Sequence, residues 1–363
     1  MNIEFKIDHI DPLGQGVSKI HDKISFIPKT LPGEVGCAQV YQQKKGVIFA
    51  ICKGLTKTSP LRTSPDCPHF GKCSACHYRH TSYQEELKFK ETNLKWILKN
   101  IKSAPGVKIF QAPQRNFYRN RVQLHYDLKK KAFGMFSTYQ NKIISVPECL
   151  LPKNEISAEI KRLYQDNAWY VEAKKQNKNK GHLEIYWHKA RLKKTWNCSY
   201  ARGGFTQVNQ EMNEKLQELV FHHAHENVTT TWDLFGGEGN LTCRLNTFRY
   251  VMDLYKVTPS NNKAQYLNID LYDKNALETL LNQNIKYPEL IIVDPPRRGF
   301  PSLHLWLEKI KPSKFIYISC WPGTLARDLG KIGNYKIEKL YLIDLFPGTF
   351  HFETMVYLER NEC

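Results

Sequence analysis

Three side chains in the last third of the chain could together perform covalent chemistry. Asp294 opens the segment DPPRRG directly after the apolar stretch 290–293, Cys320 follows the apolar stretch 316–319, and Glu353 lies in FHFETMVYL. Each alone has an ordinary interpretation, such as a small buried thiol or the polar side of a strand. Ligands, however, bind at the carboxyl ends of parallel strands. A thiol, an aspartate and a glutamate at one sheet end therefore predict a catalytic site.

A glycine-rich turn, DLFGGEGN at 233–240, predicts a site for a nucleoside. It follows an apolar strand and is expected to open a helix, and its glycines let the backbone approach a ligand closely. Asp253 ends the next predicted strand, where an acid can accept from ribose hydroxyls, and Asp270 could receive an adenine amino group. Because a phosphate-binding lysine-serine pair is missing, S-adenosylmethionine fits better than a nucleoside triphosphate.

Cysteines form a second candidate site. Cys67, Cys73 and Cys76 have dense thiolate spacing, and Cys149, in a proline-flanked loop, is the best candidate for a fourth ligand. Four cysteines fit either zinc or a four-iron cluster, and the alternative is a group of unligated thiols. The ten cysteines are not expected to form a disulfide framework, because the chain shows no export signal.

The elements that carry these residues change in kind along the chain. Short strands punctuated by glycine and proline fill residues 1–55 and predict a small, OB-like β-barrel. Residues 56–200 combine the cysteine-rich stretch, a predicted helix over 82–101 that could pack on the third domain, and further strands, which together predict a central α+β domain. Strands and helices alternate over 201–363, as in a Rossmann-like parallel sheet. Its last two stretches, YKIEKLYLIDLFP and HFETMVYLER, predict two long antiparallel strands joined by a short Pro-Gly turn. The fold class is therefore a multi-domain α/β protein.

Composition indicates the kind of partner. The 363 residues include 53 lysines and arginines against 35 acids, a formal net charge of +18. A surface this basic favours nucleic acid, with an anionic membrane face as the second choice. No run of 18 apolar residues exists, which excludes a membrane span, and the N-terminus has no apolar signal core. We therefore expect a cytoplasmic protein.

These segments together resemble the RNA uracil-C5 methyltransferases, specifically the branch with an iron–sulfur cluster and an N-terminal TRAM barrel. Residues 1–55 resemble TRAM, FTQVN at 205–209 is similar to the family's FxQxN element, and DLFGGEGN is similar to its cofactor turn. DPPRRG, SCWPGTLARDL and FPGTFHFET are similar to three signatures of its catalytic domain. The resemblance covers nearly the whole chain.

The resemblance implies S-adenosylmethionine-dependent methylation of uridine C5 in RNA. Cys320 would attack C6 as the nucleophile, and Glu353 would remove the C5 proton as the general base. It also implies a [4Fe–4S] cluster, with zinc as the alternative, on Cys67, Cys73, Cys76 and Cys149. The residues that would contact the cofactor or the target base are Gln207, Phe235, Asn240, Asp253, Asp270 and Asp294.

The sequence departs from the family at three positions near the expected pocket. Gly236 stands where cysteine is usual, Trp321 replaces an asparagine, and Gly348 replaces a histidine. These changes could alter the shape of the pocket, the choice of substrate or the rate. Arg297 and Arg298 are candidates for raising the thiolate fraction of the nucleophile.

Large-subunit (23S) ribosomal RNA is the expected substrate, and a uridine in the T-loop of transfer RNA is second. Two further classes remain open. A DPP-type N-methyltransferase would need neither Cys320 nor Glu353, and a non-catalytic RNA-binding protein would have a degenerate cofactor turn. No obligate protein partner is evident, and a monomer is expected.

Overall fold

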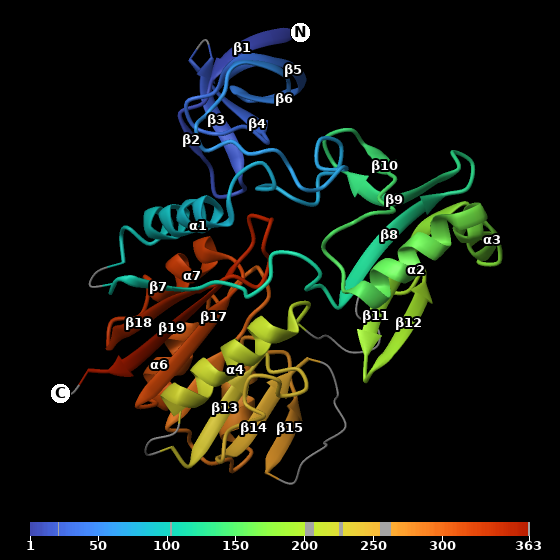
Figure 1. Ribbon diagram of the computed structural model, residues 1–363. Helices are drawn as coiled ribbons and strands as arrows, with labels where there is room; N and C mark the ends of the chain where they lie inside the picture. The colour runs from blue at the N-terminus through green and yellow to red at the C-terminus, as the bar shows by residue number, and fades with distance from the viewer. Residues whose placement is uncertain (21, 102–103, 200–206, 225–227, 255–262, 362–363) are drawn as a thin grey trace. The chain divides into compact units, whose positions relative to one another are not determined.

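The computed structural model describes residues 1–20, 22–101, 104–199, 207–224, 228–254 and 263–361 (Figure 1). The chain forms two compact units, each built from separate segments. The first unit comprises Met1–Lys90, Pro113–Gln210 and Phe346–His351, and the second comprises Glu91–Ala112, Glu211–Leu345 and Phe352–Cys363. The division at 1–55, 56–200 and 201–363 stays a prediction.

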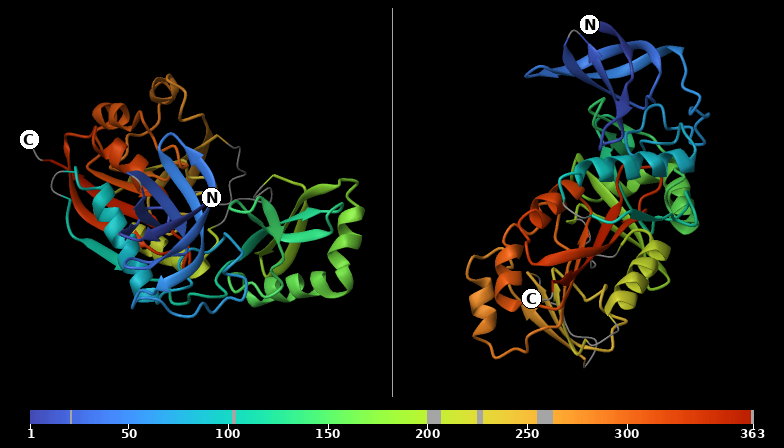
Figure 2. Two further views of the ribbon diagram at one scale, coloured as in Figure 1. Left: turned by 90° about the horizontal axis from the view of Figure 1, so that it is seen from above. Right: turned by 90° about the vertical axis from the view of Figure 1, so that its left-hand side faces the viewer.

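The first unit begins with a curled six-stranded sheet in the order β1-β5-β6-β4-β3-β2 (Figures 1 and 2). Its strands are β1 (Asn2–Lys6), β2 (His9–Ile10), β3 (Gln15–Ile20), β4 (Lys23–Pro28), β5 (Val35–Lys44) and β6 (Val47–Lys57). Apolar residues alternate along β1, so that Ile3 and Phe5 point into the core of this sheet together with Ile27 of β4. The predicted strand-rich N-terminal region is confirmed.

A second, five-stranded antiparallel sheet in the order β10-β9-β8-β11-β12 follows in the same unit. Its strands are β8 (Arg121–Asp127), β9 (Ala132–Ser137), β10 (Lys142–Ile144), β11 (Lys180–His188) and β12 (Arg191–Trp196). Helices α2 (Asn154–Tyr164) and α3 (Ala168–Lys174), joined by the short helix η1 (Gln165–Asn167), supply Ile156, Ile160 and Trp169 to its core. Strands β8 to β11 fall on stretches that were predicted to be strands, whereas β12 and these helices were not predicted.

The second unit is built on an eight-stranded sheet in the order β15-β14-β13-β16-β17-β19-β18-β7. Strands β13 to β17 are parallel, whereas β19 runs antiparallel between β17 and β18. The strands are β7 (Val107–Phe110), β13 (Thr230–Leu234), β14 (Phe248–Asp253), β15 (Ala264–Asn268), β16 (Leu290–Val293), β17 (Lys314–Ser319), β18 (Tyr335–Ile343) and β19 (Glu353–Arg360). The predicted parallel sheet that ends in two antiparallel strands is confirmed.

Helices cover both faces of this sheet. Helix α4 lies on one side, and α5 and α6 lie on the other (Figure 2). The core on the side of α5 and α6 also takes residues from α7 and from the second half of α1, for example Leu325 and Leu94. The helices of this unit are α1 (Tyr83–Ile97), which begins in the first unit, α4 (Gln210–Ala224), α5 (Ala276–Leu281), α6 (Leu303–Ile310) and α7 (Pro322–Leu329).

Three details of the second unit differ from the sequence prediction. The glycine turn does not open a helix, because residues 235–244 form successive turns before β14 begins. Strand β7, expected in the central domain, pairs in parallel with β18 at the edge of this sheet. The connection between β18 and β19 spans residues 344–352 rather than a tight Pro-Gly turn. Within the described ranges, no helix is both long and apolar enough to cross a membrane.

Candidate active site

The strand register brings Cys320 and Glu353 together at one end of the inner strands β17 and β19 of the eight-stranded sheet. In the antiparallel pair β17–β19, Ser319 lies opposite Thr354. Cys320 directly follows Ser319 and Glu353 directly precedes Thr354, so these two side chains are neighbours one step beyond that pair. Directly opposed residues in such a pair have Cβ atoms about 5 Å apart. This end of the two strands therefore places a thiol beside a carboxyl group.

Asp294 belongs to the same cluster. It directly follows β16, and its backbone N–H donates to the carbonyl oxygen of Leu234 on β13 at 3.2 Å. Its carboxyl group raises the pKa of both Cys320 and Glu353, which shows that the three groups share one electrostatic environment. The structure thus assembles the thiol, the aspartate and the glutamate that the sequence singles out.

Burial suppresses ionisation of the cysteine. The pKa of the Cys320 thiol is raised to about 12, first by burial and then by the carboxyl groups of Glu353 and Asp294. Arg297 acts in the opposite direction, as expected, but it is outweighed, and Arg298 lies over the ring of Tyr272 instead. A thiol in this state needs a further positive charge nearby before it becomes a thiolate.

Buried carboxyl groups lie beside this thiol and beside Asp294. Glu353 is 4% exposed, its Oε2 atom has no hydrogen-bond partner among the described residues, and burial raises its pKa well above the usual range. Asp233 on β13 is fully buried, and its Oδ2 accepts from Thr242 Oγ1 at 2.7 Å. Burial raises the pKa of Asp233 and of Asp294 to about 7. Such a cluster favours a cationic ligand.

The shape of the turn between β13 and β14 depends on the missing side chains of its three glycines. A Cβ atom on Gly236 would lie 2.6 Å from Cγ of Asp233, so a side chain at this position would have to displace that carboxyl group. Gly237 and Gly239 have φ angles of +53° and +76°. The N–H of Gly237 donates to Oδ2 of Asp253 at 3.0 Å, so the predicted ribose acid also holds the turn.

The other predicted cofactor residues of the second unit differ in how far their side chains are free to contact a ligand. Phe235 is half-buried and packs against the rings of Tyr272 and Phe300. Asp270 is exposed, and its Oδ1 accepts from the N–H of Tyr272 at 2.9 Å. The side-chain amide of Asn240 is engaged with Asn213 and Gln217 on α4, which leaves its backbone as the simpler contact for a ligand.

Gln207 belongs to the first unit rather than to this end of the sheet. Its carbonyl oxygen accepts from Nδ2 of Asn120 at 2.9 Å, and its side chain is buried. Phe205, in the same predicted element, lies outside the described residues. The role of Gln207 toward the cofactor or the base stays a prediction.

Trp321, the residue after the nucleophile candidate, directly precedes α7. Its backbone N–H and C=O both bond to the hydroxyl of Ser319 at 3.1 Å, which locks the backbone on either side of Cys320. The indole is half-exposed and lies 3.4 Å from the Cβ position of Gly323, so a glycine there leaves it room. An asparagine could not offer the same flat apolar surface.

The four cysteines meet in the first unit. Cys76 packs with Phe70, Tyr118 and Leu151, and Cys67 and Cys149 contact this group. Cys73 belongs to the neighbouring core, which Cys149 also contacts. The described cysteines are all free thiols, and among the described residues no three His, Cys, Asp or Glu side chains are arranged to hold a metal ion.

Cations lie close to these thiols. Lys29 donates to the carbonyl oxygens of Phe70 and Cys73, and Arg79 bonds to the thiol of Cys76. Burial and the neighbouring thiols raise the pKa of Cys149 to about 12. A negatively charged group bound by four thiolates would match this positive surrounding, so the donor chemistry fits a metal cluster although the geometry is not that of a metal site.

Two features of the site had no clear signal in the sequence. Asp233 reads as a strand residue before the glycine turn, and only the fold shows that it is a buried carboxyl group beside Asp294. Glu86 reads as one of several acids on a surface helix, yet it is fully buried and binds Lys90, Arg115 and the backbone of Gly348. A charged residue at a core position of the helical pattern was the only available hint.

Comparison with solved structures first defines the class of fold. The crystal structure of a tRNA (uracil-54, C5)-methyltransferase of Pyrococcus abyssi, in complex with S-adenosyl-L-homocysteine, superposes with a TM-score of 0.72 at 19% identity. The match covers 98% of this chain and 100% of that chain. The fold is therefore that of a methyltransferase with a curled N-terminal sheet.

Comparison with known sequences then shows which family the chain resembles. Residues 281–361 match the model of the tRNA (Uracil-5-)-methyltransferase family. The 23S rRNA (uracil(1939)-C(5))-methyltransferase of Shewanella frigidimarina is 25% identical over 99% of this chain and 96% of that protein. An uncharacterized RNA methyltransferase of Bdellovibrio bacteriovorus is 28% identical over 98% of this chain and 94% of that protein. The resemblance to the RNA uracil-C5 methyltransferases, and with it the prediction of a methyltransferase, is confirmed.

Proposed function

We propose that this protein transfers a methyl group from S-adenosylmethionine to C5 of a uridine in RNA, with Cys320 as a covalent nucleophile. The single observation that carries the proposal is the register of β17 and β19, which sets the Cys320 thiol beside the Glu353 carboxyl group. A thiolate and a carboxylate that are neighbours in this way can both reach one flat pyrimidine ring. The family resemblance supplies the identity of the base.

The chemistry needs the thiol because uracil C5 is a poor nucleophile by itself. The Cys320 thiolate adds to C6, a C6–S bond forms, and the electrons of the C5–C6 double bond move to the C4 carbonyl as an enolate. C5 then takes the methyl group, while the donor's carbon–sulfur bond breaks with its electron pair left on the donor sulfur. Bound S-adenosylmethionine supplies that electrophilic methyl group and a positive charge.

Release of the product needs the glutamate. After transfer, C5 carries both its hydrogen and the new methyl group, so the double bond cannot re-form until the proton leaves. Glu353 takes this proton, the C5–C6 double bond re-forms, and the sulfur of Cys320 departs as a thiolate. The raised pKa values of Glu353 and Cys320 mean that both groups need the nearby positive charge to ionise.

The residues of this chain fit such a cofactor. Oδ1 of Asp233 and Oε2 of Glu353 are buried oxygen atoms without a hydrogen-bond partner among the described residues. The glycines of the turn leave its backbone open, with nothing within 4 Å of the Cβ position of Gly237. Asp253, Asp270 and Phe235 would hold the ribose and the adenine, as the resemblance implies.

RNA binding would involve the first unit. Lys44 and Lys53, on β5 and β6 of the curled sheet, are exposed, as is Lys45 in the turn between these strands. Phosphate contacts from such lysines offset the few kcal/mol needed to unstack a base. We propose that this sheet is a TRAM domain, that 23S ribosomal RNA is the substrate, and that the protein acts in the cytoplasm as a monomer; transfer RNA is the second candidate.

The four cysteines would hold a [4Fe–4S] cluster, with zinc as the alternative. The proposal is supported by their common apolar surroundings and by the positive charges of Lys29 and Arg79 beside them. The methyl transfer consumes no electrons, so the cluster would have a structural role.

Mapping of the RNA product tests the function. In vitro transcribed 23S ribosomal RNA and an unmodified tRNA transcript are incubated with S-adenosylmethionine and analysed by mass spectrometry for 5-methyluridine. We expect product with the wild-type protein and with Cys243→Ala, which alters an exposed cysteine of the same unit, but none with Cys320→Ala. An N-methylated nucleoside formed by both the wild-type protein and Cys320→Ala, without 5-methyluridine, would favour a DPP-type N-methyltransferase. Failure of the wild-type protein to bind S-adenosylmethionine in calorimetry would favour a non-catalytic RNA-binding protein.

A further inference from the structure

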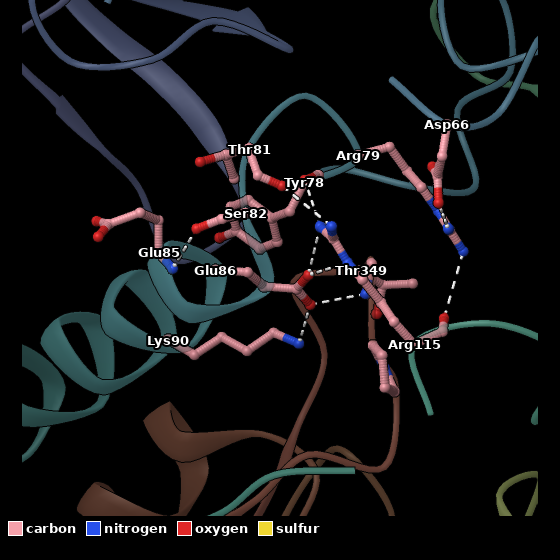
Figure 3. Close-up of polar contacts among 12 residues, drawn as sticks. Asp66, Tyr78, Arg79, Thr81, Ser82, Glu85, Glu86, Lys90, Arg115 and Thr349 are labelled. Atoms are coloured by element: carbon pink, nitrogen blue, oxygen red, sulfur yellow. Dashed lines mark hydrogen bonds and ion pairs between the residues drawn. The ribbon is translucent and has the colours of Figure 1, made fainter. Parts of the chain in front are cut away.

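Glu86 in the first turn of α1 is a fully buried carboxylate with an unusual number of partners. Its Oε1 accepts from Nζ of Lys90 at 2.7 Å, and its Oε2 accepts from Nη2 of Arg115 at 2.9 Å (Figure 3). Lys90 is itself 1% exposed. Desolvating such charges is expensive, and close geometry with additional hydrogen bonds is needed to offset the cost.

Glu86 also binds the backbone of another segment. The N–H of Gly348 donates to Oε1 of Glu86 at 2.7 Å, and Nζ of Lys90 also reaches the carbonyl oxygen of Phe346 at 3.4 Å. Both residues lie in the connection 344–352 between β18 and β19. The buried charges therefore bind the stretch of chain that leads directly into Glu353.

The segment after Cys76 holds the same residue from its other side. The N–H groups of His77 and Tyr78 both donate to the carbonyl oxygen of Gly348, at 2.8 and 3.2 Å. The N–H of Gly348 is thus bound by Glu86, and its carbonyl oxygen is bound by the N–H groups of His77 and Tyr78. A third contact comes from Tyr118, whose hydroxyl donates to the carbonyl oxygen of Pro347 at 3.0 Å.

The absence of a side chain at 348 belongs to this arrangement. Gly348 has a φ of +80°, where a residue with a Cβ atom is strained, and that Cβ would lie 3.2 Å from Nε of Arg79. Arg79 is occupied with Asp66, to which its Nη1 donates at 2.8 Å (Figure 3). The segment is therefore fastened through its backbone rather than through a side chain.

We propose that Glu86 is a positioning residue for the proposed reaction: it fixes the backbone at Gly348 and so sets the orientation of Glu353 for removal of the C5 proton. The inference rests on the proposed function, and Glu86 itself touches neither substrate nor cofactor. The backbone at Gly348 is thus clamped from two sides. One half of this clamp is Glu86 with its partners Lys90 and Arg115, and the other half is the pair of N–H groups of His77 and Tyr78. Loosening of either half moves the base without touching the nucleophile.

The two chemical steps separate this role from a general effect on folding. Attack by Cys320 and methyl transfer do not need Glu353, whereas elimination does. A misplaced base therefore leaves the methylated RNA bonded to Cys320, and a complex that survives denaturation accumulates even with ordinary uridine RNA. A merely destabilised protein forms less product and less complex in parallel.

The test uses the full-length protein with in vitro transcribed 23S ribosomal RNA under single-turnover conditions. For Glu86→Gln we expect product release to slow by about tenfold to a hundredfold, with accumulation of the covalent complex, while its rate of formation with 5-fluorouridine RNA stays at the wild-type value. Tyr118→Phe removes one hydroxyl that holds the same segment, and we expect a smaller accumulation of the same complex. Glu85→Gln, on the same turn of α1 but paired with the exposed Lys88, is the matched control and should behave as wild type.

Two results separate the inference from the function on which it rests. If the wild-type protein forms neither 5-methyluridine nor a 5-fluorouridine complex, the proposed function is wrong. If the wild-type protein does both, but Glu86→Gln and Tyr118→Phe slow attack and release equally without accumulated complex, the positioning role is wrong. Thermal unfolding of each variant identifies loss of the fold, and Tyr118→Phe decides the question if Glu86→Gln does not fold.

Discussion

The buried carboxyl groups of the active site predict that binding of the methyl donor depends on pH and that binding of the demethylated product does not. Asp233 and Asp294 are about half protonated near neutrality, because their pKa values are raised to about 7 by burial and, for Asp294, by its neighbour Asp233. S-adenosylmethionine carries a sulfonium cation that S-adenosylhomocysteine lacks. Because a cation favours the charged form of a nearby carboxyl group, binding of the methyl donor should release protons.

The magnitude follows from these pKa values. A group with a pKa of about 7 in the free protein that is fully ionised in the complex weakens binding by the factor 1 + 10^(pKa − pH). Between about pH 6 and about pH 8 this factor falls about tenfold for one carboxyl group, and about a hundredfold for two. The affinity for S-adenosylmethionine should therefore rise as the pH rises through about 7 and level off above it.

Isothermal titration calorimetry in buffers of different ionisation enthalpy measures both the dissociation constant and the number of protons released. We expect a pH-dependent Kd and proton release for S-adenosylmethionine, a nearly constant Kd for S-adenosylhomocysteine, and a weaker pH dependence for Asp294→Asn. The same pH dependence for both ligands, or none for the methyl donor, would refute the view that this carboxyl cluster faces the sulfonium charge.

Further predictions concern the turn, a buried ion pair and the cysteines. Gly236→Ala should weaken S-adenosylmethionine binding more than Gly237→Ala, because only at 236 does the new Cβ meet Asp233; calorimetry of both variants checks this, and equal losses would contradict it. Arg121→Met leaves Glu184 buried without its 3.0 Å partner and should destabilise the protein by about 3–5 kcal/mol. Lys88→Met, which removes an exposed ion pair, should change stability by under about 1 kcal/mol. Thermal unfolding compares the two variants, and similar shifts in their melting temperatures would show that burial is not decisive. Protein purified without oxygen should be brown and contain iron and sulfide in equal amounts, both lost in Cys149→Ala; colourless protein with one zinc would establish the alternative.

Local patterns predicted much of the catalytic half of the fold because its strands are short, apolar and followed by characteristic polar residues. Asp294 and Cys320 were assigned to strand ends from the stretches that precede them, and the strands end there in the structure. The antiparallel pairing of β18 and β19 was also predicted, since both stretches are long and apolar. What the sequence could not show is the register that sets Cys320 opposite Glu353, because it depends on pairing between residues more than thirty positions apart.

The missed features depend on long-range packing. The stretch 107–110 reads as a strand, but nothing local tells which sheet it joins, and it pairs with β18. The glycine turn was expected to open a helix, but Gly237 and Gly239 adopt positive φ angles, and Asp253 accepts from the turn, so the chain continues in turns instead. Helix α2 had readable spacing at Ile156, Ile160 and Leu163, which the strand-rich surroundings obscured. The role that we propose for Glu86 could not be predicted from the sequence, because its partner Gly348 lies 262 positions away along the chain.

The central claim is that the sulfur of Cys320 bonds to C6 of a uridine. RNA that contains 5-fluorouridine tests it most directly, because fluorine at C5 cannot leave as a proton and the methylated intermediate stays attached to the enzyme. After incubation with S-adenosylmethionine, digestion and mass spectrometry, we expect a peptide in which Cys320 carries the methylated 5-fluorouridine nucleotide, and no such peptide from Cys320→Ala. A stable complex attached to another residue, or a wild-type protein that methylates uridine C5 without forming any complex, would contradict the account.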